Sequence, residues 1–379
     1  MTDTSAISGL RGKLSLSGDV SCFCGFDGFV DEVVHTVDSR LDAEHYTRIE
    51  TLSEYGKRIS GASGLSLNVE IVPVSKKLGG NGPIFALGLK NYGADITYVG
   101  AVGVNALDPV FEKLAEGSRI IGIAEPSRTD AMEFMDGKII RSKLSSFTEV
   151  SWESILRHVG LERFVGFLDD ADMISFNNWT MLPYMNGIWE HILEEAVPRM
   201  DGEKIPEKVL FFDLADPEKR LKSDICRALE LIKSFKDCGF CTVLGLNKKE
   251  ACEIAQVLGH TVADPRDEPL RALNEFIAEK LGLDCVTVHP LDGASCVYRG
   301  GYHYVTGPYC AKPRLTTGAG DNYNAGFVYA FLQGWNMEEC LTMGTASSGY
   351  YVRNARSADR QELAGFLEKW ENGSLDRDA

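Results

Sequence analysis

The segment Thr316-Thr317-Gly318-Ala319-Gly320-Asp321 stands directly before an apolar run with helical spacing, residues 327–332. It therefore predicts a helix N-terminus, where unpaired backbone N–H groups and the positive end of the helix dipole form an anion site. Gly318 and Gly320 lack a Cβ, so a phosphate can approach the main chain closely. Asp321 would lie beside that anion, where a carboxylate is a poor phosphate ligand but a suitable acceptor for the proton of an attacking hydroxyl. The alternative is that Thr317 or Asp321 caps the helix and the glycines form a turn.

Upstream of this segment, short strand-like apolar runs alternate with longer amphipathic helical runs, a pattern typical of an α/β fold. Because helices follow the strands, we expect right-handed crossovers and a central, mostly parallel sheet flanked by helices. The predicted strands cover residues 20–26, 96–99, 173–176, 208–213, 242–245 and 285–288, and the clearest helices cover 224–235, 248–258 and 268–281.

Residues 33–78 interrupt this alternation. They predict a strand at 35–37, a helix at 46–59 and a strand at 67–74, and a hairpin at 131–144 that turns at Asp136-Gly137 would add to the same sheet. We expect a small sheet that projects from the main body. It would either cover a site or form a dimer contact.

Three further polar segments carry functional hypotheses. Gly79-Gly80-Asn81-Gly82 suits the close approach of a hydroxyl-rich ligand, and its alternative role is a strand-to-helix turn. Asp27 and Asp31 follow the first strand, at the sheet edge where α/β folds usually bind ligands, but both could be turn residues, Asp27 more readily because it precedes Gly28. Asn247 and Glu250 have the spacing of a capping box, which is a more common role than metal or phosphate binding.

Composition limits the classes of function. The chain has 379 residues, of which 44% are hydrophobic and 25% charged, as in globular proteins with a large core. Its formal net charge of −16 repels nucleic acid and anionic membrane surfaces, so neither is an expected partner. To bind an anionic substrate, a protein with this net charge would need local positive potential, from backbone amides or a bound metal. The ten cysteines are scattered without a zinc-site pattern, which favours buried thiols and a cytoplasmic location.

The chain contains no P-loop, H-E-x-x-H or G-x-S-x-G motif. Instead, it resembles the ribokinase-like, PfkB-type carbohydrate kinases over about residues 19–356. Residues 316–321 are similar to the C-terminal signature of that family, and residues 79–82 with 93–103 are similar to its N-terminal signature. The first strand, the projecting segment and Asn247-x-x-Glu250 also occur in the family's order.

The resemblance implies a three-layer ribokinase-like fold with a small β lid. It also implies transfer of the γ-phosphoryl group of ATP to a hydroxyl of a small sugar or sugar-like substrate. By this likeness Asp321 is the general base, and the amides of Gly318, Ala319 and Gly320 form an anion hole for the transferring group.

The same resemblance assigns the binding residues. Asp31, Gly79, Gly80 and Asn81 would hold substrate hydroxyls, with Asp27 as a weaker candidate. Asn247, Glu250 and Thr317 would bind the nucleotide, and Glu250 would organise Mg²⁺ through water. Leu315 stands where the family commonly has an aspartate that helps to bind a monovalent cation, so the resemblance does not extend to that ion.

The implied main domain covers residues 19–32, 79–130 and 145–370, and the lid covers 33–78 with 131–144. Residues 1–18 and 371–379 would be tails. In this family the lid often mediates dimers, so a homodimer through the lid is a further expectation.

Two alternatives use the same fold. A nucleoside kinase would be favoured by an aromatic-lined pocket, for which Phe26, Phe29 and Trp179 are available. A non-catalytic sugar-binding protein is suggested by the departures from the family pattern at Pro83, Pro290 and Leu315. The sequence leaves open which sugar is used, which hydroxyl is phosphorylated and whether ATP or ADP is the donor.

Overall fold

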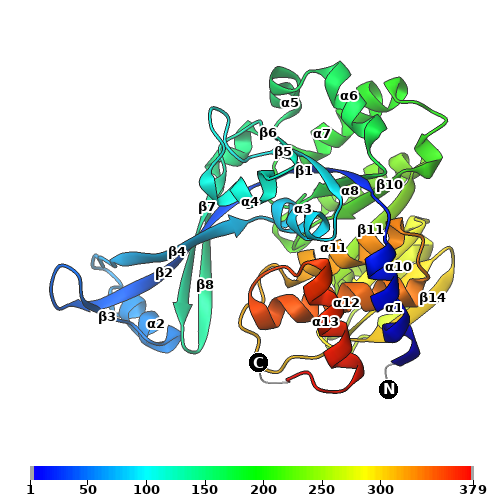
Figure 1. The fold of residues 1–379 in the computed structure, drawn as a ribbon. Helices are drawn as coiled ribbons and strands as arrows, with labels where there is room; N and C mark the ends of the chain where they lie inside the picture. The colour runs from blue at the N-terminus through cyan, green and yellow to red at the C-terminus, as the bar shows by residue number, and fades with distance from the viewer. Residues whose placement is uncertain (1–3, 377–379) are drawn as a thin grey trace.

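The computed structural model describes residues 4–376, which form two β-sheets (Figure 1). The larger sheet has nine strands in the order β14-β13-β12-β11-β10-β9-β1-β5-β6. All neighbours from β12 to β6 pair in parallel, and β13 and β14 add an antiparallel hairpin at one edge. The predicted central, mostly parallel sheet is therefore confirmed. The strands are β1 Ser21–Phe26, β5 Asp95–Gly100, β6 Arg119–Gly122, β9 Met173–Asn177, β10 Val209–Asp213, β11 Cys241–Asn247, β12 Cys285–His289, β13 Gly293–Tyr298 and β14 Gly301–Thr306.

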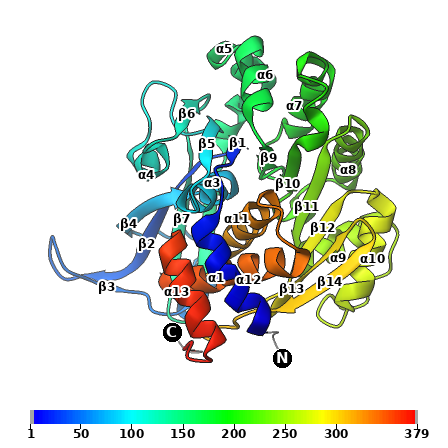
Figure 2. The same ribbon diagram turned by 45° about the vertical axis from the view of Figure 1, so that its right-hand side comes forward.

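Helices cover both faces of this sheet, and each face has its own apolar cluster, so the predicted three layers are present. One face carries α5 Trp152–His158, α6 Leu161–Asp170, α7 Met185–His191, α8 Lys222–Asp237, α9 Lys248–Val257 and α10 Leu270–Leu281. The other carries α1 Thr4–Leu16, α3 Asn81–Asn91, α4 Glu112–Ala115, α11 Ala319–Leu332, α12 Met337–Asn354 and α13 Arg360–Glu371 (Figure 2).

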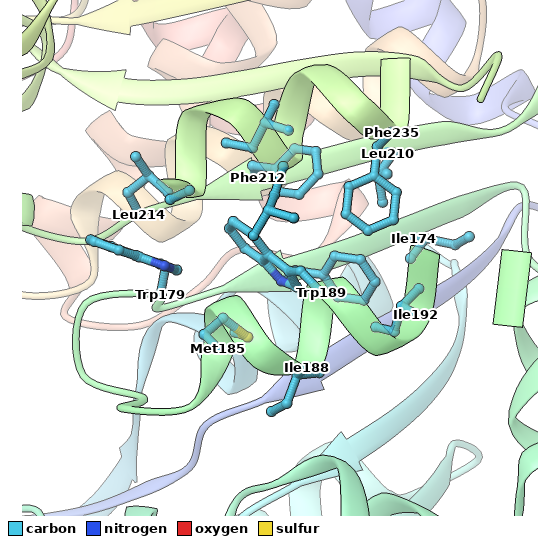
Figure 3. Packing of buried hydrophobic residues seen from close by; sticks show 14 of the residues in the cluster. Ile174, Trp179, Met185, Ile188, Trp189, Ile192, Leu210, Phe212, Leu214 and Phe235 are labelled. Carbon is cyan, nitrogen blue, oxygen red and sulfur yellow. The ribbon is translucent and has the colours of Figure 1, made fainter. Parts of the chain in front are cut away.

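Aromatic side chains fill the interior next to β9 and β10 (Figure 3). The ring of Phe212 lies 5.1 Å from that of Trp189, 5.7 Å from Phe235 and 6.1 Å from Phe176, centroid to centroid. Every residue of β9 and β10 is buried, since helices cover both faces, and this explains why the sequence shows unbroken apolar runs there. The carboxyl ends of these strands are therefore held by dense packing.

The second sheet projects from the main body (Figure 1). This projecting sheet has the order β3-β2-β7-β8, and β4 also pairs with β2, in antiparallel orientation. Its strands are β2 Phe29–Arg40, β3 Tyr46–Arg48, β4 Ile71–Gly79, β7 Ser127–Phe134 and β8 Gly137–Lys143, and α2 Leu52–Gly61 packs on it. The predicted hairpin is confirmed, but its turn lies at Met135-Asp136, one residue before the predicted position, because Gly137 already belongs to β8 and pairs with Phe134.

The element boundaries within the projecting sheet differ from those predicted. The helix begins at Leu52 rather than residue 46, because Thr51 caps it and Tyr46–Arg48 pair with β2 instead. The strand β2 already begins at Phe29, since pairing with β4 and β7 extends it beyond its apolar centre. The apolar periodicity of a short segment cannot predict these boundaries, because they are set by pairing with strands elsewhere in the chain.

Residues 4–16, assigned above to an N-terminal tail, form helix α1 and belong to the folded core. Ile7, Leu10 and Leu14 are buried, and α1 lies against α13 and α12 (Figures 1 and 2). Lys13 Nζ also pairs with a carboxylate oxygen of Glu339 at 2.6 Å. The tail assignment was wrong for this segment because a one-sided apolar stripe becomes informative only when its partner surface is known.

All ten cysteines are free thiols, and six of them are buried, as expected. A cytoplasmic location remains a prediction. Among residues 4–376, no helix combines the length and apolar character needed to cross a bilayer.

Candidate active site

The loop before α11 has the geometry of an anion site. The predicted helix is present, but α11 begins at Ala319 and includes Gly320, which was predicted to precede the helix. Gly318 precedes the helix with a φ of 93°, a conformation that favours glycine. A Cβ on Gly318 would lie 2.6 Å from the Tyr351 hydroxyl, so the position also lacks room for a side chain. No side chain caps this helix, which excludes the capping role considered for Thr317 and Asp321.

The amides of this loop are not equivalent. The Ala319 N–H donates to the Thr316 carbonyl at 3.1 Å, whereas the amides of Gly318 and Gly320 have no hydrogen-bond partner within the described part of the chain. An incoming anion therefore finds the Gly318 and Gly320 amides free. The prediction that all three amides are available needs this correction for Ala319, because the turn before the helix uses its N–H.

Asp321 lies in the first turn of α11 and is 6% exposed. One of its carboxylate oxygens accepts a hydrogen bond from Asn81 Nδ2 at 2.9 Å, which joins the two glycine-rich signatures. Burial raises the pKa of Asp321 well above its usual range, and the nearby carboxylates of Asp213 and Asp27 raise it further. The charged form thus depends on positive charge or donors brought to the site.

Two cavities meet at Asp321. The inter-sheet cavity, about 190 Å³, lies between the projecting sheet and residues 315–321. The strand-end cavity, about 170 Å³, lies at the carboxyl ends of β10, β11 and β12. Asn81, Gly318 and Asp321 line both cavities. A group bound in one cavity can therefore reach a group bound in the other beside a single carboxylate.

The inter-sheet cavity brings together most of the predicted substrate residues. Asp31, Gly80 and Asn81 line it, together with Thr317, which was predicted to bind nucleotide. Gly79 does not line the cavity, but a Cβ there would lie 2.4 Å from the Asp31 carboxyl carbon. Burial raises the pKa of the Asp31 carboxyl, and the charge of Lys77 partly opposes this.

The structure does not place Asp27 in either cavity. Asp27 is fully buried and accepts hydrogen bonds from the Gly82 amide at 2.9 Å and from Asn178 Nδ2 at 2.7 Å. Burial raises its pKa to about 6 in spite of these donors. Asp27 therefore holds the loop at residues 79–82 in place from outside both cavities, and this position contradicts its assignment as a substrate ligand.

Asn178 is a residue that the sequence reasoning missed. It follows β9, adopts a left-handed φ of 59° and lines the inter-sheet cavity. Its side chain is 2% exposed, and its Oδ1 has no hydrogen-bond partner among the described residues. A strained backbone together with an unsatisfied buried acceptor is typical of a ligand contact. Its position at the end of a predicted strand was the available signal.

Carboxylates dominate the strand-end cavity, which Asp213, Glu250 and Asp321 line. Asp213, at the end of β10, was also missed although it follows a predicted strand. It accepts hydrogen bonds from the Ala215 amide at 2.9 Å and from Asn324 Nδ2 at 3.0 Å. Burial and the charge of Glu250 raise the pKa of Asp213 to about 8.

Asn247 and Glu250 form the capping box that was the alternative to a binding role. Asn247 Oδ1 accepts from the Glu250 amide at 2.9 Å, and Glu250 accepts from the Asn247 amide at 2.8 Å and the Asp216 amide at 3.0 Å. Both residues nevertheless line the strand-end cavity. Each Glu250 oxygen keeps a free lone pair, so capping and contact with a bound group are compatible.

The donor set of the strand-end cavity fits a magnesium ion. Its carboxylate oxygens and the amide oxygen of Asn324, which is buried without a partner among residues 4–376, are hard ligands of the kind that Mg²⁺ takes. No lysine or arginine lines this cavity. A polyphosphate could enter a space with three carboxylates only together with a cation.

Comparison with known proteins agrees with this geometry. Residues 11–370 match the model of the prokaryotic ketohexokinase family. Over 344 residues the chain is 27% identical to the ketohexokinase of Haloferax volcanii, an alignment that covers 90% of this chain and 89% of that relative.

Solved structures share the fold. The Arabidopsis thaliana ribokinase complexed with ribose and ATP superposes with a TM-score of 0.63 at 16% identity, covering 93% of this chain and 99% of that one. The adenosine kinase from Sinorhizobium meliloti gives a TM-score of 0.65 at 17% identity, covering 93% of this chain and 100% of that one. The chain is therefore a carbohydrate kinase with the ribokinase-like, PfkB-type fold. Within this class it belongs to the prokaryotic ketohexokinase family.

Proposed function

We propose that this enzyme transfers the γ-phosphoryl group of ATP to a hydroxyl group of a ketohexose bound in the inter-sheet cavity. Family membership and the similarity to the Haloferax volcanii ketohexokinase support the substrate class. The observation that carries the proposal is that Asp321 and Gly318 border both cavities. A sugar hydroxyl on one side and a phosphoryl group on the other would meet beside one carboxylate and one helix N-terminus.

In the proposed reaction, Asp321 is the general base. The hydroxyl oxygen bonds to the γ-phosphorus while the bond between that phosphorus and the β–γ bridging oxygen breaks, and ADP leaves with the electron pair. The hydroxyl proton passes to the Asp321 carboxylate. The free amides of Gly318 and Gly320 donate to the phosphoryl oxygens as charge moves across the group, and Gly318 must remain a glycine to present them.

Polar side chains of the inter-sheet cavity would hold the sugar. Asp31 and Asn81 line it, and the unpartnered Oδ1 of Asn178 is an acceptor for a sugar hydroxyl. The nucleoside alternative finds little support, because Phe26 and Trp179 are buried away from the cavity and Phe29 is the aromatic side chain among its lining residues.

The nucleotide phosphates would occupy the strand-end cavity with Mg²⁺. Glu250 would hold the ion through water, and Asp213 and Asn247 would complete its surroundings. When bound, Mg²⁺ would offset the negative charge of the phosphates and carboxylates. The same charge would lower the raised pKa of Asp321, so that its carboxylate is available as a base at neutral pH. Leu315 contributes an apolar side chain to the inter-sheet cavity, and we propose no monovalent cation.

The projecting sheet would act as a lid over the sugar and as a dimer contact. Several large apolar side chains in the loops that connect its elements are exposed, among them Leu65 at 80%, Met135 at 71% and Leu41 at 68%. Exposed apolar area of this kind favours a second copy of the chain as partner. Sedimentation of the purified protein would test this, and a monomer at all concentrations would contradict it.

The proposed function is tested with a substrate panel. Ketohexoses, aldohexoses, ribose and adenosine are offered with ATP and Mg²⁺, and ADP release is followed with a coupled assay. We expect at least one ketohexose to exceed all aldohexoses and adenosine in kcat/KM by about tenfold or more, the size of discrimination that one or two sugar contacts provide. Adenosine as the best substrate would favour the nucleoside kinase, and no turnover of any compound would favour a binding protein.

A further inference from the structure

The charges around the two cavities are distributed unequally. Three carboxylates line the strand-end cavity without a lysine or arginine. Among the described residues that line either cavity, the lysine and arginine side chains are Lys77 and Lys138, and both come from the projecting sheet. His289 also lines the strand-end cavity, but burial lowers its pKa to about 4, so it is neutral at pH 7. The side-chain cations that line the cavities beside Asp321 are therefore those of this sheet.

Lys138 is the one of the two that reaches the anion loop. It stands near the start of β8, which in Figure 1 is the strand of the projecting sheet drawn on the side of the C-terminal helices. Its Nζ donates to Thr317 Oγ1 at 2.7 Å, across 179 residues of sequence. Thr317 immediately precedes Gly318, whose free amide faces the incoming anion in the proposed reaction. The ammonium group thus lies beside the cradle formed by this loop.

Lys138 also differs from neighbouring lysines in its partners. On the same sheet, Lys76 pairs with Glu32 at 2.8 Å and Lys143 pairs with Asp130 at 2.9 Å. No carboxylate oxygen lies within 4 Å of Lys138 Nζ in the part of the chain that the structure describes. Partial burial and the charge of Lys77 lower the pKa of Lys138, and the charges of Glu133 and Asp31 oppose this only in part. An ammonium group in these surroundings is stabilised by an anion.

We propose that Lys138 is a catalytic residue whose ammonium group binds the γ-phosphoryl oxygens during transfer and then the phosphate of the sugar product. The proposal rests on phosphoryl transfer at Asp321 as described above. Lys138 keeps its proton and donates a hydrogen bond to a non-bridging oxygen, while Asp321 takes the hydroxyl proton. The bond to Thr317 would be exchanged for this contact when the phosphoryl group arrives.

If Lys138 binds the transferring phosphoryl group, the rate of phosphoryl transfer depends on the position of the projecting sheet. The carboxylates of the strand-end cavity and the amides of Gly318 and Gly320 come from the main body, whereas the Lys138 ammonium group is carried by β8. The phosphoryl group would then be stabilised fully only when the projecting sheet lies over the inter-sheet cavity. Water in an open site would lack that stabilisation, which disfavours hydrolysis of ATP.

The test compares Lys138→Met with Lys143→Met, a change of the same kind on the same strand outside both cavities. We expect Lys138→Met to lower kcat about 10²-fold, the typical effect of losing one donor to a transferring group, with the KM for sugar within about threefold of wild type. Lys138→Arg should restore part of the rate, and Lys143→Met should leave it unchanged. A kcat for Lys138→Met within twofold of wild type, or a loss confined to the KM for sugar, would overturn the proposal.

Thr317→Val separates direct contact from positioning of the loop. It removes the hydroxyl that Lys138 bonds and keeps the lysine, so we expect a rate loss at least tenfold smaller than that of Lys138→Met if the ammonium acts on phosphate. Equal losses in the two variants would reduce Lys138 to a positioning residue and overturn its catalytic assignment. The assays use whichever sugar the wild-type enzyme phosphorylates, so failure of a ketohexose as substrate and failure of the Lys138 assignment are separate results.

Discussion

The nine-stranded sheet and the projecting sheet serve the same site but are packed in different ways. Every residue of β9 and β10 is buried, whereas β8 has no buried residue and β4 has Gly79 alone. The apolar cluster of the projecting sheet consists of Val34, Ile49, Tyr55, Met132 and Phe134, while dozens of residues fill the clusters on either face of the main sheet.

This difference in packing matches the different roles that we propose for the two regions at the site. The densely packed body carries Asp213, Asp321 and the glycine loop, which must hold their geometry while charge moves. The lightly packed sheet carries Asp31 and Lys138, which face the proposed substrate and transferring group. Regions with few buried contacts open at low free-energy cost, so substrate entry through the projecting sheet does not require the catalytic body to loosen.

The largest expected effect comes from the body. Asp321→Asn removes the proton acceptor and keeps the shape of the side chain, so we expect kcat to fall about 10² to 10⁴-fold with ATP affinity largely retained. Coupled ADP release measures the rate, and calorimetric titration measures nucleotide binding. Turnover near the wild-type rate would show that the carboxylate is not the base.

A matched pair of core deletions tests the contrast in packing directly. Phe212→Ala, within the aromatic cluster of Figure 3, should lower the free energy of unfolding of the whole protein by about 3–5 kcal/mol. Phe134→Ala, whose ring lies 5.4 Å from that of Tyr55, should instead raise hydrogen exchange mainly in residues 29–79 and 127–143. We also expect Phe134→Ala to reduce kcat/KM about tenfold, because a loosened projecting sheet no longer holds Asp31 and Lys138 in position.

Denaturation and hydrogen-exchange mass spectrometry on both variants provide the measurements. If Phe134→Ala raised exchange in β9 and β10 as much as in the projecting sheet, the two regions would be one cooperative unit. The proposed separation between a rigid body and an opening sheet would then be wrong.

The smallest effect concerns the pH dependence of stability in the body. The pKa of Asp213 is raised from an ordinary 3.8 to about 8 in the folded protein. Between these values the folded state holds a proton that the unfolded state releases, so the contribution of this group to stability is greatest below pH 4 and falls as the pH rises toward 8. Asp213→Asn should therefore reduce the drop in Tm between pH 5 and pH 8 by several degrees. The exposed Asp237→Asn is the control, and equal drops in wild type and Asp213→Asn would contradict the raised pKa.

Features that depend on a few neighbouring residues could be predicted. Local spacing and chain stiffness predict a helix start at the glycine-rich segment before Asp321, the capping box at Asn247 and Glu250, and the strands around β9 to β12. Asn178 and Asp213 could not be assigned in the same way. Each follows an ordinary buried strand, and each becomes part of the site because β9 and β10 are neighbours near α11.

The sequence by itself determined an α/β chain with a phosphate-cradling loop, one acid beside it and a separate small sheet, because helix starts and alternating strands depend on local geometry. Only the tertiary structure decided which amides stay free, that Asp27 supports a loop from behind, and that Lys138 meets Thr317. Such contacts join residues far apart in the chain, and strand order and packing, which no local pattern encodes, bring them together.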